Sequence, residues 1–196
     1  MSNFDVKENK VICVLPWVHE FRDIPDAIAP CCWAENLPKG KTIADVRQSM
    51  LNNIKPKACQ VCYKSEKESN FSYRIQETTS WVKKFGEPDI QNPLLQFLDI
   101  RYDPTCNLKC KTCGPDASTL WQKEKNVSIA INLNNQKYIH QVDKKILKKV
   151  LLTGGEPTYI KDYLDFLNEL LIITIQPQRA GIRGQCPQVL FNFCLS

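Results

Sequence analysis

The sequence lacks any apolar run close to the ~20 residues that a membrane-spanning helix needs. Its first ten residues, MSNFDVKENK, carry charges of both signs and no apolar core of the kind found in secretory signals. The sequence therefore shows neither of the usual signs of membrane insertion and secretion. We therefore expect a cytoplasmic protein with no membrane partner.

Histidine and, toward the C-terminus, acidic residues are scarce. The chain has 2 histidines, and His140 is the only one in its second half. A zinc site in that half would therefore have few nitrogen ligands to draw on. Residues 172–196 contain no Asp or Glu and lose the apolar pattern, which predicts a truncated or altered C-terminus. We do not expect Cys186 and Cys194, which lie there, to be ligands.

An excess of positive charge is present but small. Lys and Arg number 26 against 21 Asp and Glu, for a formal net charge of +5. The lysines are scattered rather than gathered into a stripe, so no nucleic-acid partner is expected. The densest run, KKILKK at 144–149, alternates with apolar residues and predicts the solvated face of a helix over 138–149.

Cysteine, by contrast, is abundant, with 10 residues in 196. The cytosol keeps thiols reduced, so a disulfide scaffold is excluded and ligation of a metal or cluster becomes the leading explanation. Their clustering supports this interpretation. The groups are the adjacent pair Cys31 and Cys32, the C-x-x-C pair Cys59 and Cys62, and the C-x-x-x-C-x-x-C set Cys106, Cys110 and Cys113.

The chain reads as two parts joined by a connector. Residues 11–65 form a Cys-rich module whose one clear helix starts at Thr42, capped with Asp45. Residues 66–93 form a connector, a polar helix over 66–85 followed by a linker with two prolines. Residues 94–196 form the second domain.

Strands and helices alternate in the second domain, which predicts an α/β fold with a parallel sheet. Buried strands are expected at 94–102 and 149–155, and an amphipathic helix at 160–171. Asp116 or Ser118 caps a helix after the cysteine loop, and another strand begins near Ile172. At ~30 residues per βα unit, the domain holds about three units.

The loop TCNLKCKTCG brings together three soft thiolate ligands, Cys106, Cys110 and Cys113. Iron–sulfur clusters are held by such ligands, and three of them leave one iron of a [4Fe–4S] cluster open to a cofactor or substrate. The loop therefore predicts a catalytic cluster. The alternative is a zinc site or free thiols.

This loop, which follows LDIRYD, resembles the signature of the radical SAM superfamily. The resemblance implies a partial (βα) barrel and the cofactor S-adenosylmethionine (SAM), which the cluster cleaves reductively to a 5′-deoxyadenosyl radical. It also implies partners: a reductase or a flavodoxin- or ferredoxin-type electron donor, and a peptide, protein or other biosynthetic substrate from which hydrogen is abstracted. One residue departs from the pattern, since Thr112 stands where the family often has an aromatic residue near the adenine.

A second match is the turn formed by Thr153, Gly154, Gly155, Glu156 and Pro157. In the family such a GGEP turn contacts the methionine end of SAM, and its Glu binds the amino group. Glycines permit close approach of the backbone to a ligand, and a carboxylate suits an ammonium group. The resemblance therefore implies that Glu156, with the three cysteines, belongs to the catalytic site.

The N-terminal cysteines resemble the short auxiliary-cluster module called twitch, related to SPASM. The shared words are Cys13-V-L-P-W, the P-C-C at 30–32 and the C-Q-V-C-Y that contains Cys59 and Cys62. The resemblance implies a second [4Fe–4S] cluster, held by Cys13, Cys59, Cys62 and either Cys31 or Cys32, with Cys31 favoured because it follows the proline. A structural zinc site is the alternative, because both centres accept C-x-x-C.

Together these features predict a radical SAM enzyme: a truncated, partial (βα) barrel preceded by a small Cys-rich α+β auxiliary-cluster module. The alternative function is a non-catalytic iron–sulfur or zinc-binding relative that acts as a binding module.

Overall fold

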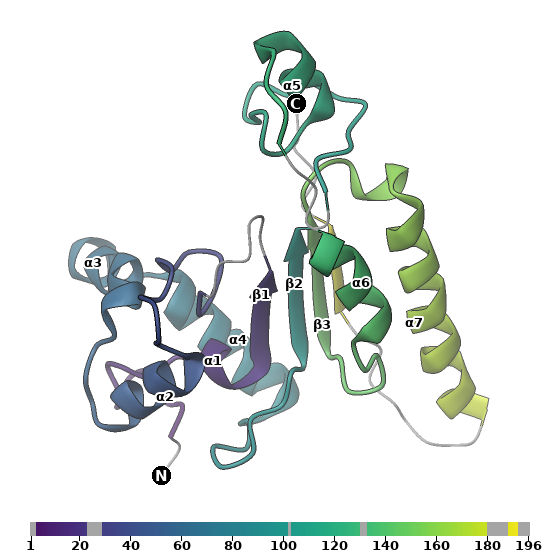
Figure 1. Cartoon of the computed structure of the whole chain (residues 1–196). Coiled ribbons are helices and arrows are strands. Elements are labelled where there is room, and N and C mark those ends of the chain that lie inside the picture. Colours follow the sequence, from purple (N-terminus) through teal and green to yellow (C-terminus); the bar gives the residue numbers. More distant parts are fainter. Residues whose placement is uncertain (1–2, 23–28, 102, 130–132, 180–187, 192–196) are drawn as a thin grey trace. The chain divides into compact units, whose positions relative to one another are not determined.

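The computed structural model describes residues 3–22, 29–101, 103–129, 133–179 and 188–191 (Figure 1). The chain divides into two compact units. The first comprises Met1–Phe21 and Ala27–Gln96, and the second comprises Arg22–Asp26 and Phe97–Ser196. Each unit has its own apolar core, so the candidate residues of each are described within it.

The first unit is mostly helical. Its elements are α1 (Leu15–Val18), β1 (His19–Arg22), α2 (Ile43–Leu51), the 3-10 helix η1 (Lys57–Cys59), α3 (Gln60–Ser69) and α4 (Tyr73–Phe85). The segment around α1 forms the centre of the core, where Ile12, Leu15 and Trp17 are at most 2% exposed. Cys13 lies within this central segment, between Ile12 and Leu15.

Helix α2 confirms the start predicted at Thr42. The Thr42 side chain accepts a hydrogen bond from the Asp45 backbone N–H, and the Asp45 carboxylate accepts one from the Thr42 N–H at 2.8 Å. This reciprocal capping box satisfies two backbone donors that a helix start leaves without partners. Val46 and Met50 then face the core, whereas Ile54 lies beyond the helix and is 58% exposed.

The single polar helix expected over 66–85 is wrong, because two helices occupy this region. Asn70 ends α3 in the left-handed conformation (φ 56°), which asparagine tolerates better than most residues. Ser72 then caps α4 by accepting a hydrogen bond from the Ile75 N–H at 3.2 Å. Helix α4 buries Arg74 and Trp81, so it forms part of the core of the first unit.

The second unit alternates strands and helices. Its elements are β2 (Phe97–Arg101), α5 (Thr119–Lys125), α6 (Leu133–Gln141), β3 (Lys149–Thr153), the 3-10 helix η2 (Pro157–Tyr159), α7 (Lys161–Arg179) and β4 (Gln188–Phe191). Strand β3 pairs in parallel with both β2 and β4. The predicted α/β fold with a parallel sheet is confirmed, and within the described residues the sheet is open rather than a closed barrel.

Two helices of this unit differ from the predictions. Helix α6 ends at Gln141, before most of the predicted 138–149 segment, because the Asp143 side chain accepts the Lys145 N–H at 3.0 Å and forms a turn. Helix α7 continues through Ile172, where a strand was expected, and ends at Arg179.

The buried face of α7 is also narrower than its apolar pattern suggested. Tyr163, Phe166 and Leu170 are at most 2% exposed, whereas Leu164 and Leu171 are 43% and 54% exposed. The buried residues follow the i, i+3, i+7 spacing of one helix face.

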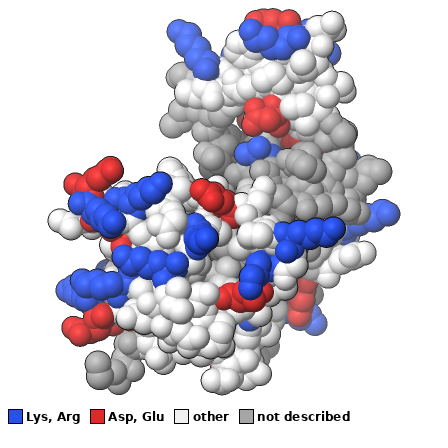
Figure 2. Space-filling view, turned by 60° about the vertical axis from the view of Figure 1, so that its left-hand side comes forward, with Lys and Arg blue, Asp and Glu red and all other residues white. Residues whose placement is uncertain are grey.

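Figure 2 shows Lys and Arg side chains interspersed with Asp, Glu and uncharged residues on the face in view. This mixture agrees with the scattered lysines of the sequence. None of the helices in the described ranges has the length and apolar character required to cross a membrane.

Candidate metal centres

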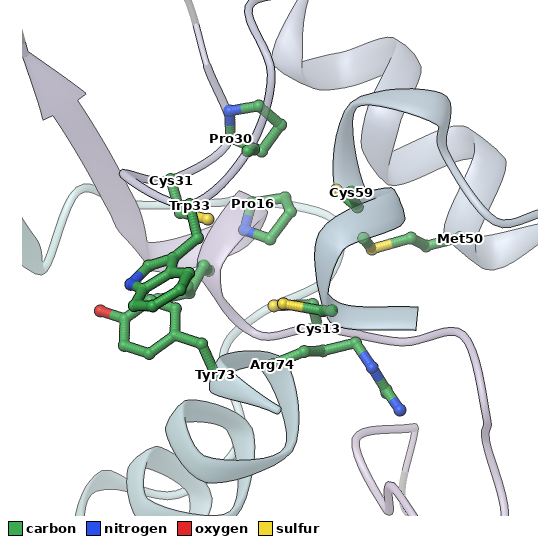
Figure 3. Close-up of a pocket in the computed structure, with 12 residues that line it drawn as sticks. Cys13, Pro16, Pro30, Cys31, Trp33, Met50, Cys59, Tyr73 and Arg74 are labelled. Atoms are coloured by element: carbon green, nitrogen blue, oxygen red, sulfur yellow. The ribbon is translucent and has the colours of Figure 1, made fainter. Parts of the chain in front are cut away.

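Four cysteines of the first unit line one pocket (Figure 3). Cys13 immediately precedes the α1 region, Cys31 follows Pro30, Cys59 ends η1, and Cys62 lies in the first turn of α3. The other lining residues are Leu15, Pro16, Pro30, Trp33, Ala34, Met50, Tyr73 and Arg74. Residues distant in sequence therefore bring together four soft donors in a largely apolar setting.

Burial dominates the acid–base behaviour of these thiols. It raises the pKa of Cys13, Cys31 and Cys59 to about 12 each, and raises the pKa of Cys62 as well. Charge on a neighbouring cysteine adds to the effect at Cys13, Cys31 and Cys59, which indicates that the thiols lie close together. The four are therefore protonated near neutral pH, and a metal binding there would displace their protons.

The backbone around Cys13 is anchored by side chains of α3 and α4. The Tyr63 hydroxyl donates to the Val11 carbonyl at 2.8 Å, and the Arg74 guanidinium donates to the Ile12 carbonyl at 2.5 Å. On the other side of Cys13, the Val14 N–H donates to the Thr78 hydroxyl at 3.1 Å. These bonds fix the chain immediately before and after the cysteine.

The aromatic rings of Trp33 and Tyr73 lie together at the pocket, with centroids 6.1 Å apart and an angle of 31° between the planes (Figure 3). Trp33 is 58% exposed, so it lines the pocket at its solvent side and is not part of the core. The Pro30 carbonyl, next to Cys31, lies 3.2 Å from Nδ1 of the buried His19.

The adjacent cysteines at 31 and 32 have different environments. Cys31 is buried and lines the pocket, whereas Cys32 is exposed and does not line it. None of the eight cysteines in the described ranges forms a disulfide. Cys186 and Cys194 lie outside the described residues.

The second cysteine cluster lies on the loop between β2 and α5. Cys110 is buried, and Cys106 and Cys113 are partly exposed. The loop is bonded to α5 at two points: the Thr119 hydroxyl donates to the Cys106 carbonyl at 2.9 Å, and the Trp121 indole N–H donates to the Cys110 carbonyl at 3.0 Å. Backbone geometry of the loop is thus set by a neighbouring helix.

Ser118 both starts α5 and contacts the cysteine loop. Its side chain caps the helix by accepting the Trp121 N–H at 3.4 Å, as one of the two predicted caps would, and its hydroxyl donates to the Leu108 carbonyl at 2.7 Å. Ser118 is 1% exposed although it is polar. One side chain therefore starts the helix and fixes the loop.

The turn after β3 lies directly against the chain that leads into the cysteine loop. The Gly155 N–H donates to the Asp103 carbonyl at 2.8 Å, and the Glu156 N–H donates to the Thr105 carbonyl at 2.9 Å. Because Thr105 immediately precedes Cys106, the two segments are joined within one residue of the first loop cysteine.

Both glycines of the turn are required by this approach. A Cβ on Gly155 would lie 1.9 Å from the Thr105 carbonyl oxygen, and one on Gly154 would lie 2.6 Å from that of Asp103. Gly154 also has a φ of +113°, which L-residues with side chains rarely adopt. The turn is therefore specific to glycine for steric reasons.

The other residues of the turn hold it in place. Thr153 pairs with Arg101 at the ends of β3 and β2, and its hydroxyl donates to the Ile100 carbonyl at 3.3 Å. Pro157 is buried. The Glu156 carboxylate caps η2, accepting the Thr158 hydroxyl at 2.6 Å and the Thr158 N–H at 3.2 Å, both on Oε1. Its orientation is thus set by Thr158.

Across the described part of the chain, no three His, Cys, Asp or Glu side chains are gathered closely enough to hold a single metal ion. The four pocket thiols therefore surround a common space without the tight spacing that one ion requires. A zinc ion bound at ~2.3 Å by four sulfurs would draw them to within about 4 Å of one another.

Sequence reasoning noted Tyr63 as the last residue of C-Q-V-C-Y but did not identify Arg74 or Thr78 as part of the first site. A usable signal was present in α4, where Arg74 lies four residues before Thr78 and seven before Trp81, on one helix face. A cation on the apolar face of a helix requires a buried partner.

Comparisons with known proteins give a distant, partial match. The chain is 28% identical over 93 residues to GTP 3′,8-cyclase of Haemophilus influenzae strains PittEE and 86-028NP. The match covers 45% of this chain and 27% of the relative, so the chain spans about a quarter of that protein's length. No protein-family model matches the chain, and no solved structure matches it.

Proposed function

We propose that this chain is a radical SAM protein whose [4Fe–4S] cluster is held by Cys106, Cys110 and Cys113. One observation carries the proposal: the Gly154–Glu156 turn is hydrogen-bonded to the residues directly ahead of Cys106. Two motifs that are about 40 residues apart in sequence are thereby adjacent at the C-terminal ends of neighbouring parallel strands, where α/β folds bind their ligands. The distant similarity to GTP 3′,8-cyclase, a radical SAM enzyme, points the same way.

The residues of the loop fit such a cluster. Thiolates are the ligands iron–sulfur clusters use, and the loop offers three, of which two are partly open to solvent. The same half of the chain offers few nitrogen ligands for zinc, because His140 is its only histidine. A cluster spreads its ligands over several irons, so it tolerates wider spacing than one ion does.

When bound, the cluster supplies the electron that cleaves SAM to methionine and a 5′-deoxyadenosyl radical, which abstracts hydrogen from the substrate. The chain's own part is to bind and orient. Glu156, held by Thr158 through Oε1, offers Oε2 to the SAM ammonium, and the glycines let the backbone approach the ligand. Thr153 and Pro157 keep the turn in register with β2.

We further propose that Cys13, Cys31, Cys59 and Cys62 hold a second [4Fe–4S] cluster in a twitch-like module. Their common pocket and its apolar lining support this proposal, and a structural zinc ion held by the same four cysteines is the alternative. Four ligands would leave no iron open, which suits electron transfer or structural support rather than SAM binding.

The substrate class we propose is a peptide or another biosynthetic compound. A specific observation favours a second candidate, a non-catalytic binding module. The described sheet has three parallel strands and is open rather than closed into a barrel, so within the described residues it does not form the enclosure of a complete barrel.

Anaerobic reconstitution with iron and sulfide, followed by SAM and a low-potential reductant, separates the two candidates. The enzyme should release 5′-deoxyadenosine and methionine, and Cys106→Ala should abolish the release while the exposed Cys32→Ala control retains it. An iron-loaded chain that releases no 5′-deoxyadenosine would instead establish the binding module.

A further inference from the structure

A buried ion pair lies beside the cysteine pocket of the first unit. Arg74 and Glu66 form a two-point contact, Nε to Oε1 and Nη2 to Oε2, each at 2.8 Å. The Arg74 side chain is 2% exposed and that of Glu66 is 16% exposed. The cation is therefore the more deeply buried partner, which is uncommon for an arginine without a dedicated role.

The two partners lie differently with respect to the pocket. Arg74 lines the pocket together with Cys13, Cys59 and Cys62, whereas Glu66 does not line it. Figure 3 shows Arg74 beside Cys13. The remaining guanidinium nitrogen, Nη1, donates to the Ile12 carbonyl, one residue before that cysteine.

Two further contacts hold the guanidinium in this place. It lies 5.5 Å from the centroid of the Tyr63 ring, within the range of a cation–π contact. The Ser72 hydroxyl donates to Glu66 Oε1 at 2.6 Å and so fixes the carboxylate. The guanidinium is thus held in one position beside Ile12 and Tyr63.

A purely structural role would be to join α3 to α4. A buried ion pair is a weak way of doing so, because the desolvation of both charges offsets their attraction, and apolar residues of similar volume serve as well or better. What an apolar pair cannot supply is a fixed positive charge at a pocket whose thiols become anionic on binding metal.

We propose that Arg74 is the built-in counter-charge of the metal centre formed by Cys13, Cys31, Cys59 and Cys62, and that Glu66 holds it in position. This inference rests on the second cluster put forward above. Arg74 stabilises the loaded, anionic centre, and it favours the reduced cluster, which carries one more electron. Glu66 opposes this effect, since its negative charge also acts on Cys62.

The test uses the full chain with Cys106, Cys110 and Cys113 all replaced by Ala, so that only the first centre loads. After anaerobic reconstitution, the midpoint reduction potential is measured by titration monitored through paramagnetic resonance. Arg74→Met should lower the potential and Glu66→Gln should raise it. Arg74→Lys, which keeps the charge but loses the forked contact, should stay near the parent value.

Opposite shifts distinguish the proposal from a structural role, because loosening the α3–α4 contact would act in the same direction in both variants. A loaded cluster whose potential is unmoved, or moves the same way in both, overturns the role of Arg74 and leaves the second cluster standing. A parent chain that binds zinc without sulfide overturns both. Should Arg74→Met fail to load, Glu66→Gln decides: a raised potential supports the proposal and an unchanged one refutes it.

Discussion

Replacing Gly155 with Ala tests whether the turn after β3 holds the cysteine loop in place. The added Cβ would lie 1.9 Å from the Thr105 carbonyl oxygen and 2.8 Å from the Pro104 carbonyl carbon. Both are backbone atoms, which cannot rotate aside as the end of a flexible side chain can. The turn and the segment ahead of Cys106 must therefore separate.

The free-energy cost of this separation comes from the hydrogen bonds that it breaks and from the crowding that remains. The hydrogen bonds from the Gly155 and Glu156 N–H groups to Asp103 and Thr105 contribute about 1 kcal/mol each. Residual crowding adds about 1–3 kcal/mol. The sum, about 3–5 kcal/mol, corresponds to local opening that is at least a hundredfold more frequent, at about 1.4 kcal/mol per decade.

Hydrogen–deuterium exchange resolved by peptide measures this opening in the segment that spans β3 and η2. Iron and sulfide analysis after reconstitution then tests the consequence, which is loss of the cluster at Cys106 while the first centre stays loaded. Gly40→Ala is the matched control, since Gly40 has a positive φ (+83°) but no atom within 4 Å of an added Cβ.

Unchanged exchange in the β3–η2 segment of Gly155→Ala, together with a full iron content, would refute the reasoning. So would an equal loss of iron in Gly40→Ala, because the effect would then belong to general destabilisation rather than to the contact with Thr105.

Three further outcomes follow from individual contacts. Cys31→Ser should remove the iron of the first centre and Cys32→Ser should not, as judged by iron and sulfide content; the reverse pattern would make Cys32 the ligand. Glu156→Ala should weaken SAM binding tenfold to a hundredfold, because it removes a charge-assisted hydrogen bond worth about 1.5–3 kcal/mol. Thr158→Val should weaken SAM binding less, because it removes only the hydroxyl that holds Glu156 Oε1. Titration of SAM against the reduced cluster's paramagnetic resonance measures both, and equal affinity in all three proteins would exclude Glu156 from the site. Tyr163→Phe should destabilise the second unit by about 1 kcal/mol, because the hydroxyl lies 2.8 Å from the Thr153 carbonyl and 3.0 Å from that of Ile100; exchange in β3 that matches the parent would contradict this.

Features encoded by neighbouring residues were predictable. The capping box of Thr42 and Asp45 appears where the sequence placed it, Ser118 is the cap of the two that were predicted, and the strand predicted over 149–155 begins at Lys149 and ends at Thr153. Each depends on residues within a few positions of one another, so local chemistry alone determines it.

Helix ends were less predictable, because they depend on single polar residues within longer patterns. Asn70 divides the helix expected over 66–85, and Asp143 ends α6 early by capturing a backbone N–H. Apolar residues on either side of Asp143 preserve a helical period through the turn. Val142 and Ile146 both lie beyond the helix, and they are 8% and 36% exposed. The apolar period therefore predicted a helix that continues past the observed end at Gln141.

Contacts between distant segments were the least predictable. The sequence pattern of Gly154 and Gly155 indicates a close approach but not its partner, which proves to be the backbone at Asp103 and Thr105. Arg74 likewise has no local motif that links it to Cys13, because the connection passes through the fold of α3 and α4.

The two cysteine groups differ in ways that follow from their surroundings and bear on their separate roles. Cys13, Cys31 and Cys62 of the first unit are buried, and burial raises the pKa of Cys13 and Cys31 to about 12, so these two thiols stay protonated until a metal binds. The loop of the second unit keeps Cys106 and Cys113 partly exposed and fixes its shape through backbone hydrogen bonds to α5. An enclosed site with four ligands and a counter-charge suits a cluster that stays closed. A partly open loop with three ligands, joined to a glycine turn that can approach a ligand closely, suits one that binds SAM.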